Sequence, residues 1–111
     1  MIIDITKARR EFKEYVKRYN PEDEKVKLKI VHIQEVSRIA RKLAEELRLD
    51  KEDIELAELI GLLHDIGRFE QIRIYHTFVD KDSINHGEYG VKVLFEDGLI
   101  RNLYKTINMI I

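Results

Sequence analysis

The sequence contains few residues that interrupt a helix. Its 111 residues include one proline, Pro21, and five glycines. Elsewhere apolar residues recur at spacings of three and four, which is typical of amphipathic helices. The first such segment is Asp4–Tyr19, where Asp4 is expected to cap the helix and Asn20-Pro21 to end it. This pattern predicts an all-α fold.

Two further helices are predicted by the same spacing. One extends from near Glu22 to about Arg48, and the next covers Lys51–Ile66 after Asp50, which is suited to cap it. The second half of this helix, Leu59–Leu63, is apolar on all sides, which is typical of a buried helix. We expect Gly67 to form its C-terminal cap.

The C-terminal part of the chain also shows helical spacing. A helix is predicted over 84–96, with Asp82 or Ser83 as its cap and Gly98 at its end. The spacing then continues over 99–110, and the chain stops on apolar residues. We therefore expect a single domain over residues 1–111 that lacks its C-terminal helices. The exposed apolar face of the last helix could then support self-association.

Composition narrows the range of partners. Twenty basic and 21 acidic residues give a net charge of −1, so no broad basic face is expected and nucleic acid is an unlikely partner. The absence of cysteine excludes disulfides and thiolate metal sites, so a metal would need nitrogen and oxygen ligands. No apolar run reaches the roughly 18 residues of a membrane span, and no signal peptide is evident. The expected localisation is cytoplasmic, without a membrane partner.

The pair His64-Asp65 stands in an unusual place. It directly follows the apolar residues of the third helix and precedes Ile66. An ionised aspartate is costly to bury unless it is paired, hydrogen-bonded or bound to a cation. A structural hydrogen bond or a helix cap would explain a single His-Asp pair. A metal ion would satisfy both side chains, and such ligands suit Zn, Fe, Mn, Ni or Co.

Two other histidines are candidates to join this pair. His32 lies on the shoulder of the apolar stripe of the second helix, and His86 lies at the start of a later one. Each alone is more typical of a structural residue, and His76 has no supporting pattern. Together, however, three histidines and an aspartate at the edges of buried helix faces predict a metal site in a helical bundle.

These residues stand in motifs that resemble those of the HD-domain superfamily of metal-dependent phosphohydrolases. The resemblance covers about residues 26–98 and rests on Val31-His32, Gly61–Arg68 (GLLHDIGR) and Asn85–Gly90 (NHGEYG). It implies an HD-type bundle of about five helices. It also implies that His32, His64 and Asp65 hold one metal, and that His86 lies at a second.

The implied activity is hydrolysis of a small phosphate ester or nucleotide by a metal-activated water. One or two divalent ions (Mn, Fe, Zn, Ni, Co or Mg) would be bound, with Asp65 as a catalytic ligand. Arg68 would contact a phosphate oxygen, or else be a solvated side chain. We expect the irregular stretch 68–81, a loop with one short helix, to help select the substrate.

One expected ligand is missing from the sequence. Family members normally close the site with an aspartate on a later helix, but no histidine or aspartate follows Asp97. Truncation is the favoured explanation, and a degenerate site is the other. The alternatives to a phosphohydrolase are therefore a non-catalytic metal- or nucleotide-binding module and an inactive truncated fragment.

Overall fold

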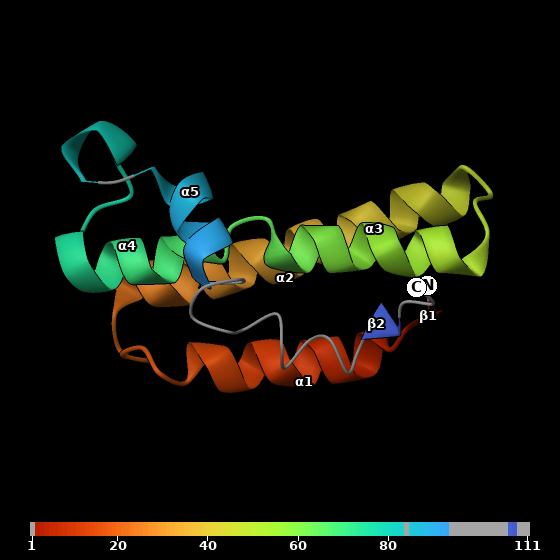
Figure 1. Cartoon of the computed structure of the whole chain (residues 1–111), viewed down its shortest axis with the longest axis horizontal. Coiled ribbons are helices and arrows are strands. Elements are labelled where there is room, and N and C mark those ends of the chain that lie inside the picture. Colours follow the sequence, from red (N-terminus) through yellow and green to blue (C-terminus); the bar gives the residue numbers. More distant parts are fainter. Residues whose placement is uncertain (1, 84, 94–106, 109–111) are drawn as a thin grey trace.

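The computed structural model describes residues 2–83, 85–93 and 107–108, and this part of the chain is almost entirely helical (Figure 1). Its elements are β1 (Ile2–Ile3), α1 (Ile5–Val16), α2 (Glu24–Glu46), α3 (Lys51–Leu63), α4 (Gly67–Tyr75), the 3-10 helix η1 (Asp80–Asp82), α5 (His86–Val91) and β2 (Ile107–Asn108). Helices α2 and α3 lie side by side, α1 packs beneath them, and α4 and α5 lie at one end. The predicted all-α class is confirmed.

Local capping determines where the first three helices begin. Asp4 accepts a hydrogen bond from the backbone N of Lys7 at 3.0 Å, and Asp50 accepts one from Asp53 at 2.9 Å, as the sequence predicted. Helix α2 begins slightly later than expected, because Asp23 serves as its cap. These side chains satisfy backbone N–H groups that have no partner within the helix.

The predicted end of the third helix was wrong. Helix α3 ends at Leu63, so His64 and Asp65 lie in the turn that follows it and not within the helix. Gly67 does not cap α3 but begins α4. The reason is the approach of α5, since a Cβ on Gly67 would collide with the backbone of His86 and of Gly90.

Two further expectations differ from the structure. The stretch 68–81 is more helical than predicted, because it contains α4 and part of η1. Helix α5 is capped by Asn85, not by Asp82 or Ser83, since the Asn85 side chain accepts a bond from the backbone N of Glu88 at 3.1 Å.

The predicted last helix is also wrong in part. Ile107–Asn108 forms an antiparallel strand with β1, in which Ile3 pairs with Ile107. Ile107 is β-branched and so suits extended backbone. Residues 99–106 and 109–111, on which the self-association prediction depends, lie outside the described residues.

The core joins α1 to the pair formed by α2 and α3. Phe12 of α1 meets Phe69 of α4 edge to face, with ring centroids 6.1 Å apart. Leu59 and Leu62 of α3 are buried, but Ile60 is 58% exposed, so this half of α3 is not buried on all sides.

None of the described helices combines the length and apolar character that a membrane span requires.

Helices α2 and α3 approach each other at Gly61. A Cβ on Gly61 would lie 2.8 Å from the Cα of Ser37, which is too close for any side chain. The hydroxyl of Ser37 donates to the carbonyl of Glu58 at 2.8 Å across the same contact. The fully buried Glu58 carboxylate pairs with Arg41 at 2.8 Å and with Arg9. This contact sets the distance between His32 on α2 and the end of α3.

Replacing Gly61 with alanine should lower the free energy of unfolding by up to about 2 kcal/mol, because the methyl group forces two backbones apart at a cost of up to about 3 kcal/mol. The gain in helix propensity, about 1 kcal/mol, offsets only part of this loss. Urea denaturation measures the effect. Gly90→Ala is the control, since its Cβ would lie 3.5 Å or more from its neighbours. Equal stability of the Gly61→Ala variant and the parent would contradict the close contact.

Candidate metal centre

The centre of the site is the carboxylate of Asp65, which lies in the turn between α3 and α4 and is only 8% exposed. Its Oδ2 atom lies 3.3 Å from Lys29 Nζ, 3.3 Å from His64 Nε2 and 3.5 Å from His32 Nε2. Its Oδ1 atom lies 3.4 Å from His86 Nε2. Nitrogen atoms from α2, from the α3–α4 turn and from α5 therefore converge on one buried carboxylate.

His64 is oriented by the end of α3. Its Nδ1 atom lies 2.7 Å from the carbonyl oxygen of Gly61, which is among the last carbonyls of the helix. Such carbonyls have no partner within the helix, so the contact is a hydrogen bond donated by Nδ1–H. In the neutral ring this leaves the lone pair on Nε2, which faces Asp65.

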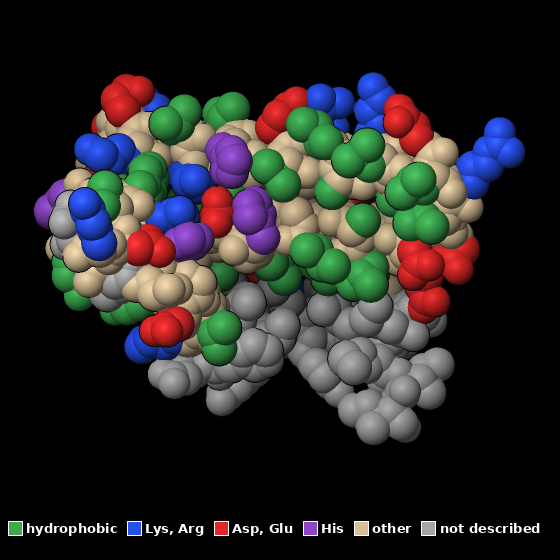
Figure 2. Space-filling model, turned by 90° about the horizontal axis from the view of Figure 1, so that it is seen from above, with side chains coloured by type: hydrophobic (Ala, Val, Ile, Leu, Met, Phe, Trp, Pro, Cys, Tyr) green, Lys and Arg blue, Asp and Glu red, His purple; other side chains and the backbone are tan. Residues whose placement is uncertain are grey.

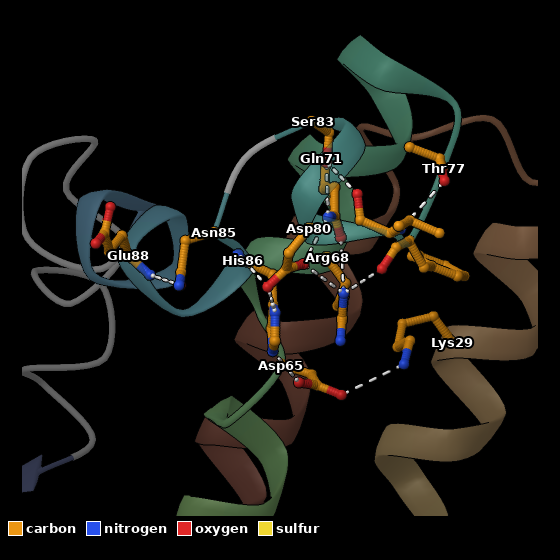
Figure 3. Close-up of polar contacts among 12 residues, drawn as sticks. Lys29, Asp65, Arg68, Gln71, Thr77, Asp80, Ser83, Asn85, His86 and Glu88 are labelled. Atoms are coloured by element: carbon orange, nitrogen blue, oxygen red, sulfur yellow. Dashed lines mark hydrogen bonds and ion pairs between the residues drawn. The ribbon is translucent and has the colours of Figure 1, made fainter.

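His86 is oriented by an acidic side chain from η1. Its Nδ1 atom lies 2.8 Å from Asp80 Oδ2, and its backbone N donates to the same oxygen at 3.4 Å. Figure 3 shows Asp80 above His86 and Asp65 below it. A carboxylate that accepts from the far side of an imidazole fixes its orientation and makes the other nitrogen a better metal ligand.

His32 completes a group that could share one ion. The candidate ligand atoms of His32, His64 and Asp65 all lie within 4.8 Å of one another. The His32 side chain is 45% exposed, so the group opens to solvent on the α2 side. His86 faces the other oxygen of Asp65. His76 is not part of the cluster, because it caps the end of α4 in the left-handed conformation, with φ 57°.

The charge of Asp65 is stabilised by its neighbours. Burial acts to raise the pKa of the Asp65 carboxyl, but electrostatic interactions with His64, Lys29 and Arg68 and the hydrogen bond from Lys29 outweigh it, and the pKa is lowered. The pKa of Asp80 falls to about 2, chiefly because His86 donates a hydrogen bond to it. Both carboxyl groups are therefore ionised at neutral pH and available to a cation or an imidazole.

Arg68 is held by the loop that follows α4. Its NH1 atom donates to the carbonyl of Phe78 at 2.8 Å, to Gln71 Oε1 at 3.0 Å and to Asp80 Oδ1 at 3.1 Å. In Figure 3 another nitrogen of its guanidinium group points toward the space between Asp65 and Lys29. The NH1 atom of Arg68 therefore holds the loop in place, whereas the other nitrogen is directed toward the site.

Two residues of the site were missed in the sequence. Lys29 precedes His32 by three residues, so the two share a face of α2, and this spacing could have revealed it. Asp80 had no such signal, because it lies in the irregular stretch, and its hydrogen bonds to the ring and backbone of His86 follow no periodic spacing.

The comparison with family models agrees with this geometry. The HD domain model matches residues 30–110, which include His32, His64, Asp65 and His86. The chain belongs to the HD domain family. HD domains are generally metal-dependent phosphohydrolases, although no curated protein and no solved structure matches this chain.

The donor set of this HD domain fits a divalent cation. Imidazole and carboxylate ligands suit Zn, Fe, Mn, Ni and Co. Two ligands at about 2.1 Å from the same ion lie roughly 3–3.5 Å apart, and the nitrogen–oxygen distances around Asp65 are 3.3–3.5 Å. The Nδ1 atoms of His64 and His86 are both engaged elsewhere, which directs Nε2 of each ring to the site.

Replacing Asp80 with alanine should weaken metal binding about 10- to 100-fold, because His86 loses the group that orients it. Asp80→Asn keeps one acceptor oxygen and should have an intermediate effect. Calorimetric titration with Mn²⁺ and with Zn²⁺ measures the affinity. Glu88→Gln is the matched control, since it removes an exposed carboxylate from α5, the helix that carries His86. Unchanged affinity in Asp80→Ala would show that Asp80 serves only the fold.

Proposed function

We propose that this HD domain is a metal-dependent phosphohydrolase that cleaves a small phosphate ester or nucleotide. One observation carries the proposal: the Nε2 atoms of His32, His64 and His86 lie within 3.5 Å of the oxygens of Asp65. A purely structural carboxylate would not need three imidazoles from three different elements. The family supports the same class of reaction.

In this proposal His32, His64 and Asp65 hold one divalent ion. His86, which faces the second oxygen of Asp65, either joins that set or helps hold a second ion. A bound ion of this kind lowers the pKa of a water molecule toward neutrality and stabilises charge on the phosphoryl oxygens.

Side chains of the protein orient the metal ligands and provide positive charge for the phosphate group. Asp65 is ionised, and the Nδ1 contacts of His64 and His86 keep their Nε2 atoms available as ligands. Lys29 and Arg68 place positive charge beside the carboxylate, where non-bridging oxygens of a phosphate group could meet them. Because the NH1 atom of Arg68 is already held, little side-chain entropy is lost when a phosphate binds.

Substitution of the central ligands should remove bound metal. We expect His64→Ala and Asp65→Ala each to lose most of the metal content of the parent protein, because each takes away a ligand atom of the three-residue group. Metal analysis after dialysis measures this. Replacing the exposed Asp53 with asparagine, in the first turn of α3, is the control. Parent-like metal content in both ligand variants would refute the site assignment.

Hydrolysis should depend on the same residues. The metal-loaded parent is expected to release phosphate from 4-nitrophenyl phosphate or to cleave bis(4-nitrophenyl) phosphate, and Asp65→Asn to lose at least about 100-fold in kcat/KM. A chelator should abolish turnover and added Mn²⁺ or Zn²⁺ should restore it. Turnover that survives in both Asp65→Asn and His64→Ala would overturn the proposed mechanism.

A further inference from the structure

The surface around Asp65 has two flanks of opposite character. Figure 2 shows histidines in the middle of this face, with Lys and Arg side chains on one side of them and hydrophobic side chains on the other. Lys29 and Arg68 lie beside Asp65: Lys29 Nζ is 3.3 Å from Asp65 Oδ2, and in Figure 3 a nitrogen of Arg68 points toward the space between Asp65 and Lys29. A molecule bound across the histidines would therefore meet positive charge at one end and apolar surface at the other.

The apolar flank contains a groove between α3 and α5. It encloses about 300 Å³ and is lined by the aliphatic side chains of Leu59, Ile60, Leu63 and Val91, together with His64 and the backbone of α5. No Asp, Glu, Lys or Arg is among the described residues that line it. Because His64 belongs to both the groove and the metal cluster, the two are continuous.

The apolar lining of the groove favours binding of an apolar group over a charged one. A phosphate or other charged group would lose its hydration there without gaining a partner, which is unfavourable. An apolar group would bury surface against Ile60 and Val91, which are 58% and 57% exposed in this structure. Burial of each CH₂ group contributes about 0.8 kcal/mol.

We propose that this groove binds the apolar leaving group of a phosphate ester while the phosphate lies on the Lys29–Arg68 flank. The inference rests on the proposed function and names the class of substrate: an ester of phosphate with an uncharged, apolar alcohol. In the reaction the oxygen of water bonds to phosphorus and the bond from phosphorus to the ester oxygen breaks. The alcohol leaves with one proton of that water.

A series of alkyl phosphates tests the proposal. Ethyl, butyl and hexyl phosphate have alcohols of nearly equal pKa, so they differ mainly in apolar surface. We expect kcat/KM of the metal-loaded protein to rise with chain length, by up to about fourfold per CH₂ group buried. Equal kcat/KM across the series, or a fall with chain length, would overturn the proposal while leaving the hydrolase intact.

Substitution in the groove should remove this selectivity. Ile60→Glu places a charge in the groove and is expected to flatten the dependence of kcat/KM on chain length. Leu47→Glu is the matched control, because Leu47 is also an exposed apolar residue, 71% exposed, but does not line the groove. The same dependence in the Ile60→Glu variant and the parent would refute the assignment of the groove.

A binding measurement separates this inference from the proposed function. Hexylphosphonate, which cannot be hydrolysed at its P–C bond, is titrated into the full chain while the methyl NMR signals are followed. We expect the signals of Ile60, Leu63 and Val91 to shift and those of Leu47 to stay in place. If no ester is hydrolysed but these shifts occur, the groove assignment stands and the hydrolase proposal fails. If esters are hydrolysed without these shifts, the groove assignment fails.

Discussion

A buried negative charge organises this structure. The carboxylate of Asp65 lies in a turn enclosed by α2, α4 and α5, where an isolated ion would be costly. Lys29 donates a hydrogen bond to it, and interactions with His64 and Arg68 add to this effect, so its pKa is lowered despite burial. Each of these residues comes from an element that also packs against the core. The arrangement of helices and the electrostatics of the site therefore depend on each other.

The parts of the fold that could be predicted depend on local sequence. Apolar spacing indicated the all-α class, and Asp4 and Asp50 marked the starts of α1 and α3 because an N-cap acts within one turn. The convergence of His32, His64 and Asp65 was also expected. The sequence feature that indicated it was His64-Asp65 next to an apolar segment, because a buried aspartate requires a partner from another part of the chain.

The parts that could not be predicted depend on contacts between distant segments. Gly67 suits both a helix cap and a close approach, and only the position of α5 shows that the second applies. Asp80 accepts hydrogen bonds from both the ring and the backbone of His86, and although the two residues are close in sequence, no apolar spacing marks this contact. The pairing of Ile107 with Ile3 likewise requires the two ends of the described chain to meet.

The bare backbone at Gly61 links the spacing of two helices to the protonation of a ligand. Its missing side chain lets α2 approach, and its carbonyl accepts the Nδ1 proton of His64. The atoms it faces are the Cα and N of Ser37, which every amino acid possesses. A larger residue at position 61 therefore cannot be rescued by a smaller one at position 37. Only a shift of the whole of α2, which carries both His32 and Lys29, could accommodate it. Second-site suppressors of such a change should thus arise far from the contact itself, at positions that let α2 slide.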